Sequence, residues 1–180
     1  VTTFDFKRPS VSNTLNINQA VIDLGGGMVE SVSDDSFVPA SGYAKYEAGT
    51  PNVSGGIGLG AAVDYLENVG MEAVSARERK LTDLLIDGLE KIEGVTVYAC
   101  RDADARVGAV SFSIEGVHPH EVSAWLDEEH GIAVRSGMHC AEPLMRRLGA
   151  ENGTVRATVS FYNTESEINT LVSVIRELLA

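Results

Sequence analysis

The sequence predicts an α+β fold in which helices pack on one face of a mostly antiparallel sheet, with an extended N-terminal arm ahead of it. In residues 54–180, the spacing of the apolar residues predicts two helices, then two strands, and then a helix, a strand, a helix, a strand and a last helix. Residues 1–53 instead are rich in Ser, Asn, Gly and Asp, and prolines 9, 39 and 51 interrupt them. Because 180 residues with 44% hydrophobic content can form one sizeable core, no second globular domain is needed.

The arm, residues 1–53, is expected to form strands and loops. Its glycine run, residues 25–27, separates two short apolar segments. Glycine has no Cβ, so this run predicts either a close approach of the backbone to a neighbour or an ordinary surface turn.

Two consecutive helices are expected after the arm. Residues 56–69 place apolar side chains on broad faces, and Gly70 supplies a stop signal. The second helix, from about 71 to 92, carries a leucine-rich stripe with charged residues mostly away from it, and Gly94 follows it.

Four strands are expected in the C-terminal region. Residues 95–98 begin the first, and residues 108–114 alternate apolar and polar side chains as a half-buried strand does. Residues 132–135 and 154–160 supply the other two.

Two further helices have recognisable first turns. Pro119 opens a helix over residues 119–129, where Val122, Trp125 and Leu126 form the inward face. Thr164 and Glu167 form a capping-box pattern ahead of the last helix, which carries a wide apolar stripe.

Charge and composition argue against several classes of partner. A net charge of -12 argues against binding to nucleic acid or to an anionic membrane surface, since both bind proteins through clustered Lys and Arg. Two cysteines, Cys100 and Cys140, make a poor disulfide framework for this length, and no apolar run approaches the roughly 18 residues of a membrane span. With no secretory leader in the sequence, we expect a cytoplasmic location.

The segment from Arg135 to Pro143 is the strongest candidate for chemistry. It places Cys140 beside His139 in a glycine-containing turn after the apolar segment 132–134. A thiolate is the nucleophilic form of cysteine, and nearby Arg135 and His139 favour that form. The alternative is a buried structural cysteine, because free cysteine is among the most buried residue types. For Arg135 the alternative is an ion pair with Glu142.

Two other positions suit the binding of anionic groups. Arg156 is expected on a strand face opposite to its apolar neighbours, where its guanidinium can bind a carboxylate with two hydrogen bonds; the alternative is a solvated arginine. Thr50 lies just ahead of a helix, where hydroxyl and backbone N–H groups can meet a phosphate, although helix capping by Thr50 or Asn52 is the alternative. His118 and His120 supply two ligands where zinc needs three or four, so no metal site is predicted.

Several segments in this order resemble the C-terminal part of the Suf-type (group II) cysteine desulfurases, which are pyridoxal-phosphate (PLP) enzymes of the class V aminotransferase family. The resemblance runs from about residue 25 to 180, while residues 1–23 match poorly. The segments that carry it are Phe37 onward, Tyr46-Glu47-Ala48-Gly49-Thr50-Pro51-Asn52, Arg135 to Pro143, Val155-Arg156-Ala157 and Phe161-Tyr162-Asn163-Thr164. It implies the C-terminal small domain of the fold-type I PLP transferases over residues 54–180.

The resemblance also implies roles for the site residues. Cys140 would be the catalytic nucleophile that carries a persulfide, and Arg156 would hold the carboxylate of the substrate cysteine. Arg135 and His139 would line the substrate pocket. Thr50 would reach the cofactor phosphate of the partner subunit across a homodimer interface. Met138 stands where many relatives have a second histidine.

The resemblance does not cover a whole enzyme. Family members are roughly twice as long, and the part without a counterpart here carries a Ser-Gly-His-Lys motif whose lysine binds PLP. None of Lys7, Lys45, Lys80 and Lys91 lies in such a context. We therefore expect a domain for converting L-cysteine to L-alanine and an enzyme-bound persulfide, inactive without a PLP-binding large domain, that passes sulfur to an acceptor protein of iron-sulfur cluster assembly. The alternative is a non-catalytic sulfur acceptor, or a regulatory domain that dimerises with an intact desulfurase.

Overall fold

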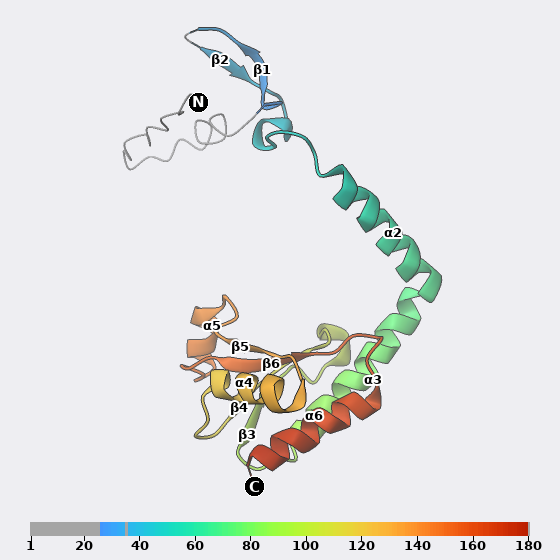
Figure 1. Ribbon diagram of the computed structural model, residues 1–180, viewed down its shortest axis with the longest axis vertical. Coiled ribbons are helices and arrows are strands. Elements are labelled where there is room, and N and C mark those ends of the chain that lie inside the picture. The colour runs from blue at the N-terminus through green and yellow to red at the C-terminus, as the bar shows by residue number, and fades with distance from the viewer. Residues whose placement is uncertain (1–25, 35, 180) are drawn as a thin grey trace. The chain divides into compact units, whose positions relative to one another are not determined.

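The computed structural model describes residues 26–34 and 36–179, which form two compact units, one ending at Asp64 and one beginning at Tyr65 (Figure 1). The expectations for residues 1–23, for Gly25 and for Lys7 lie outside the described residues. Across the described ranges, no helix has the length and apolar character needed to cross a membrane.

The first unit opens with a short antiparallel hairpin. Strand β1 (Val29–Val32) pairs with strand β2 (Phe37–Pro39), and a short 3-10 helix, η1 (Ala44–Tyr46), follows. Met28 is buried just ahead of β1, and its carbonyl oxygen accepts a hydrogen bond from the backbone N–H of Ala40 at 2.8 Å. The strands and loops expected in the arm are therefore present in its described part.

Helix α2 (Val53–Val69) begins three residues earlier than the sequence pattern indicates. Asn52 explains the earlier start, because its side-chain oxygen accepts from the backbone N–H of Gly55 at 2.9 Å and from Ser54 Oγ at 3.3 Å. No residue of α2 is buried, and most of its large apolar side chains are exposed.

The second unit contains a four-stranded sheet in the order β3-β4-β6-β5. Its strands are β3 (Val95–Tyr98), β4 (Ala109–Ile114), β5 (Arg135–Gly137) and β6 (Thr154–Thr158). All three neighbouring pairs are antiparallel, which confirms the predicted kind of sheet.

The strand expected over residues 132–135 was misplaced, because β5 covers Arg135–Gly137. Gly131 ends the preceding helix with a φ of 62°, and Ile132 and Val134 then pack against the core outside any strand. Pairing with β6 starts only where Arg135 lies opposite Arg156. The apolar residues of this segment thus indicate that it is partly buried, and they do not indicate which residues pair in the sheet.

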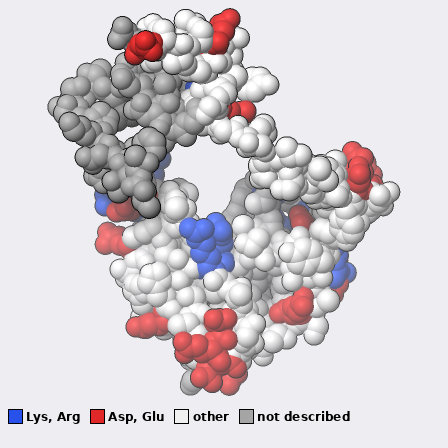
Figure 2. Space-filling model, turned by 45° about the horizontal axis from the view of Figure 1, so that its top comes forward, with Lys and Arg blue, Asp and Glu red and all other residues white. Residues whose placement is uncertain are grey.

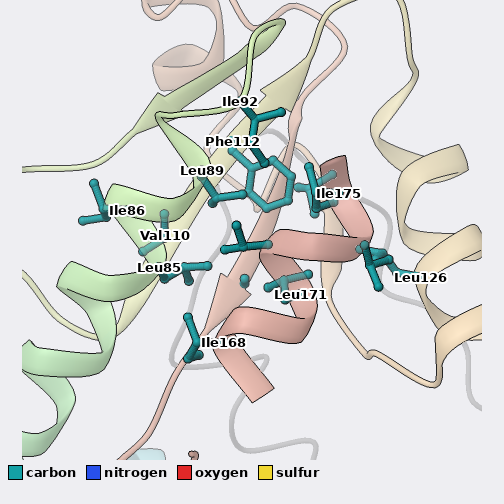
Figure 3. Close-up of a cluster of buried hydrophobic side chains, with 14 of the residues drawn as sticks. Leu85, Ile86, Leu89, Ile92, Val110, Phe112, Leu126, Ile168, Leu171 and Ile175 are labelled. Carbon is teal, nitrogen blue, oxygen red and sulfur yellow. The ribbon is translucent and has the colours of Figure 1, made fainter. Parts of the chain in front are cut away.

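Helices α3 (Met71–Leu89), α4 (Pro119–His130) and α6 (Glu165–Leu178) cover one face of this sheet, and α3 lies beside α6 (Figure 1). In β4 every second side chain is buried, and these side chains share one core with the three helices. Phe112 lies with core residues of α3 and α6 around it (Figure 3). The core contains, among others, Leu81, Leu85, Leu89, Val110, Phe112, Ile114, Val122, Leu126, Val155, Ala157, Leu171 and Ile175. The predicted α+β architecture is confirmed.

The capping box at the start of α6 is present as the sequence predicts. The side chain of Thr164 accepts from the backbone N–H of Glu167 at 3.2 Å, and Glu167 Oε2 accepts from the backbone N–H of Thr164 at 2.8 Å. Hydrogen bonding to the Thr164 backbone, with Asn163 adding to it, lowers the pKa of the Glu167 carboxyl. This cap fixes the direction in which the chain enters α6 from β6.

The surface is acidic, as the composition requires. On the face drawn in Figure 2, acidic side chains lie in several separate groups. The full sequence has 26 acidic against 14 basic residues.

Candidate functional site

A row of polar side chains crosses the sheet on the face that the helices leave open. Tyr98 is paired with Ser111, Ser111 with Arg156, and Arg156 with Arg135, so the row runs through all four strands. Arg156 lies between the buried residues Val155 and Ala157, which point into the core. The sheet therefore directs its guanidinium to the open face, as the alternation in β6 predicts.

The Arg156 side chain is half-buried, and its Nε atom has no hydrogen-bond partner among the described residues. A buried donor without a partner costs free energy unless another group satisfies it. A guanidinium with an unused donor on a rigid strand is well suited to an anionic group such as a carboxylate.

Cys140 lies in a tight turn between β5 and the short helix α5 (Glu142–Arg147). The backbone N–H of Ala141 donates to the Met138 carbonyl at 2.9 Å, and the two central residues, His139 and Cys140, have φ values of 53° and 58°. Positive φ at both central positions is the pattern of a type I′ turn, and it costs L-residues about 1–2 kcal/mol each. This turn presents Cys140 as an exposed free thiol, so the alternative of a buried cysteine does not hold.

Arg135 contacts the sulfur of Cys140 directly. Its Nη2 atom lies 3.8 Å from Cys140 Sγ, within hydrogen-bonding range for sulfur. Glu142 pairs instead with Arg146 at 2.7 Å, one helical turn further on, so the alternative ion pair between Arg135 and Glu142 is not formed. A cation is thus held beside the thiol by the strand that precedes the turn.

His139 points back toward the sheet rather than into solvent. Its Nε2 atom lies 2.9 Å from Thr154 Oγ1 and 3.1 Å from the Thr154 carbonyl oxygen, and Thr154 is fully buried. Burial lowers the pKa of His139; the hydrogen bond to Thr154 opposes this shift, while the charges of Arg156 and Arg135 add to it. The neutral imidazole is therefore favoured, and its buried Nδ1 atom has no partner among the described residues.

The lowered pKa of His139 predicts a specific pH dependence of stability. The unfolded chain takes up a proton near the ordinary value of 6.5, while the folded chain resists it, so stability should fall as the pH drops below that value. Urea unfolding at about pH 7.5 and about pH 5.5 measures this loss. His139→Gln keeps a donor toward Thr154 without a titrating group, and should lose less stability over the same interval. An equal loss in both proteins would contradict the assignment.

Four of the predicted site residues thus lie together at the edge of the sheet formed by β5 and β6. Arg135 contacts Cys140 and lies opposite Arg156, and both arginines act electrostatically on His139. Because Cys140 and Arg135 are exposed, this edge is an open surface. A cavity of about 460 Å³ lies elsewhere, between residues 130–134, the end of β6 and the start of α6, and neither Cys140 nor Arg156 lines it.

Thr50, the predicted phosphate-binding residue, belongs to the first unit. It is exposed and lies two residues ahead of Asn52, which caps α2. Of the two capping alternatives, Asn52 is therefore the cap. The phosphate role of Thr50 stays a prediction.

The described residues do not make a complete PLP site. PLP enzymes hold the cofactor as a Schiff base with a lysine, activated by burial or by a neighbouring charge. Within the described ranges, Lys45 lies over the ring of Tyr46, Lys80 is ion-paired with Glu165 at 2.8 Å, and Lys91 is exposed. None of these three lysines is buried.

The sequence pattern gave no indication of the close packing beneath the Cys140 turn. A Cβ atom at Gly153 would lie only 2.9 Å from Gly137 Cα, and nearer still to the Gly137 carbonyl group. Gly153 has a φ of 81°, so both its conformation and its surroundings require glycine. The glycines of the segment 149–153 were a possible sequence signal, but only the pairing of β5 with β6 brings Gly137 to them.

Comparison with known proteins identifies the relatives of this chain. The family model described as "Aminotransferase class-V" matches residues 10–171. A "Probable cysteine desulfurase" of Pyrococcus abyssi is 40% identical over 177 residues, which are 95% of this chain and 43% of that protein.

Solved structures agree with the sequence relatives. The apo structure of cysteine desulfurase from Thermococcus onnurineus NA1 is 44% identical with a TM-score of 0.75, covering 86% of this chain and 38% of that one. The cysteine desulfurase CsdA (S-sulfonic acid) from Escherichia coli is 39% identical, also with a TM-score of 0.75, and covers 86% of this chain and 37% of that one. The chain thus spans less than half the length of these relatives.

Proposed function

The chain belongs to the class-V aminotransferase family, and from that premise we propose that it carries the sulfur-accepting site of a Suf-type (group II) cysteine desulfurase. In the proposed reaction, the Cys140 thiol and L-cysteine give a Cys140 persulfide and L-alanine. A sulfur–sulfur bond forms at Cys140 Sγ, the carbon–sulfur bond of the substrate breaks, and the freed carbon gains a proton. The reaction therefore balances with no added oxidant or reductant.

The observation that carries this proposal is the exposed sulfur of Cys140, held in a strained turn 3.8 Å from the guanidinium of Arg135. A strained backbone that presents a reactive side chain is typical of functional sites. A cation beside the sulfur stabilises negative charge there, both on the attacking thiolate and on a persulfide anion. The exposed position leaves room for a sulfur acceptor to approach.

Arg156 is the proposed partner of the substrate carboxylate. Its strand is paired on both sides, so the Arg156 backbone is held in a fixed place, and its unpaired Nε–H is available to an anion. His139 is neutral at physiological pH because its pKa is lowered, so it adds no further positive charge beside the proposed carboxylate site. Its contact with Thr154 holds the turn against the sheet.

PLP is expected from the family, and its lysine would have to come from a large domain outside the described residues. We propose that such a domain, in the same protein or in a partner, completes the enzyme. Thr50 would then contact the cofactor phosphate of the partner subunit in a homodimer. The persulfide on Cys140 would pass to an acceptor protein of iron-sulfur cluster assembly.

The test compares the chain alone with the chain supplied with a PLP-binding large domain from a relative. L-cysteine and PLP are added, alanine is quantified, and sulfur on Cys140 is detected by mass spectrometry. We expect neither product from the chain alone and both from the combination. If Cys140 gains sulfur only from an intact cysteine desulfurase, the chain is a sulfur acceptor instead. If it gains none in any mixture, the proposal is wrong.

Arg156→Ala should strongly impair use of cysteine in the reconstituted enzyme. A charge-assisted hydrogen bond is worth about 1.5–3 kcal/mol, so kcat/KM should fall by about tenfold to a hundredfold. Arg101→Ala is the matched control, because Arg101 is exposed and ion-paired with Asp87 on the surface. Steady-state kinetics measures both variants, and an unchanged kcat/KM for Arg156→Ala would refute the carboxylate role.

A further inference from the structure

A ring of hydrogen bonds joins the start of α4 to β5, directly ahead of the Cys140 turn. His120 Nδ1 lies 2.8 Å from Ser136 Oγ, and Ser136 Oγ lies 2.8 Å from Ser123 Oγ. Ser123 Oγ lies 3.1 Å from the carbonyl oxygen of His120. These contacts link the first turn of one helix to the middle residue of the strand that leads to Cys140.

Counting hydrogens fixes the direction of every bond in this ring. The carbonyl oxygen of His120 can only accept, so the Ser123 hydroxyl must donate to it. The contact between the two serines then uses the Ser136 hydroxyl hydrogen. Ser136 Oγ has no hydrogen left for the third contact, so His120 Nδ1 must donate. With all three contacts as hydrogen bonds, Nδ1 of His120 is protonated.

The same imidazole ring packs against the end of β5. A Cβ atom at Gly137 would lie 3.2 Å from His120 Cε1 and 4.0 Å from His120 Nε2, so the ring faces the Gly137 Cα. Gly153 lies against Gly137 as well. The last residue before the Cys140 turn is thus confined by a side chain of α4 and by the backbone that leads into β6.

His118, two residues earlier, has a different task. Its Nδ1 atom accepts a hydrogen bond from the backbone N–H of His120 at 3.2 Å and so caps α4. The His120 side chain instead contacts Ser136.

We propose that His120 is a positioning residue for Cys140. A turn whose two central residues have positive φ keeps its shape only if the surrounding structure fixes both of its ends. Helix α5 holds the Ala141 end, while the pairing of Gly137 with Thr154 and the contacts of His120 hold the other. Through Ser136 and Gly137, His120 keeps the thiol beside Arg135. Only the purpose of the thiol, sulfur transfer, rests on the proposed function; the positioning of Cys140 by His120 does not.

The first experiment determines the tautomer of His120 in the unmodified chain. Long-range proton–nitrogen NMR correlations distinguish a protonated ring nitrogen from a bare one. We expect the neutral ring to carry its proton on Nδ1. A proton on Nε2 would mean that the hydrogen-bonded ring does not exist, and would overturn the proposal without any variant being made.

The second experiment measures the alkylation rate of Cys140 by iodoacetamide at one fixed pH, in a Cys100→Ser background so that only one thiol reacts. His120→Ala should slow the reaction about fivefold, because the sulfur is no longer held beside Arg135. His120→Asn, whose amide can donate from nearly the same place as Nδ1, should restore most of the rate.

His118→Ala is the matched control, because it removes the cap of α4 but leaves the contact to Ser136 intact. Equal slowing in His118→Ala and His120→Ala would show a general loss of stability and overturn the positioning role, as would failure of His120→Asn to restore the rate. Neither readout needs sulfur transfer. If both results are as expected and no persulfide ever forms, the proposed function fails while the positioning role stands.

Discussion

Replacing Cys140 with serine is expected to abolish sulfur loading of the chain. Serine has nearly the same size and the same branching as cysteine, so the turn and its contacts should survive, but a hydroxyl cannot form a persulfide. In the reconstituted enzyme, mass spectrometry should detect no added sulfur on the variant, whereas the unmodified chain is expected to gain one sulfur atom. Alanine formation should fall to the background level, because the sulfur has no acceptor on the protein.

Cys100 provides the control within the same chain. It is the other free cysteine and is also exposed, yet it follows β3 and precedes the ion-paired Arg101. Cys100→Ser should therefore load sulfur as the unmodified chain does. If persulfide formed on the Cys140→Ser variant, or if the Cys100→Ser variant gained no sulfur, Cys140 would not be the reactive thiol.

Local patterns in the sequence predicted most of the fold. The capping box of Thr164 and Glu167 was correct because it depends on residues three apart, and the alternation in β4 was correct because Phe112 and its second neighbours face a single core. The error at β5 has a physical reason. Ile132 and Val134 are apolar because they fill the edge of the core, whereas backbone pairing depends on where β6 lies, which a local pattern does not contain.

The positions of the candidate site residues were predictable to the same degree. A cysteine in a glycine-containing turn next to a strand is visible in the sequence, and an alternating strand shows that Arg156 leaves the core. The support of the turn was not visible. His120 and Ser136 are 16 residues apart, and Gly137 and Gly153 also become neighbours only through folding. Contacts of this kind need the sheet order, and the sheet order is set by the whole core.

Gly153→Ala is expected to destabilise the protein and to displace the Cys140 turn. A methyl group there would lie too close to the Gly137 backbone to be accommodated without movement, and the φ of 81° is unfavourable for alanine. We expect about 1–2 kcal/mol from the backbone conformation and about 1–3 kcal/mol from the steric conflict. Urea unfolding measures the sum, and the alkylation rate of Cys140 reports displacement of the turn.

Gly149→Ala separates these two contributions. Gly149 has a φ of 71°, but a Cβ atom there would meet nothing within 4 Å. This control should show the conformational cost alone and leave the alkylation rate of Cys140 unchanged. If the two variants lose the same stability, then the backbone at Gly137 moves away from the added methyl group without a cost in the free energy of unfolding. The Cys140 turn would in that case not be held by close packing against Gly153, and His120 with the β5–β6 pairing would have to fix its position instead.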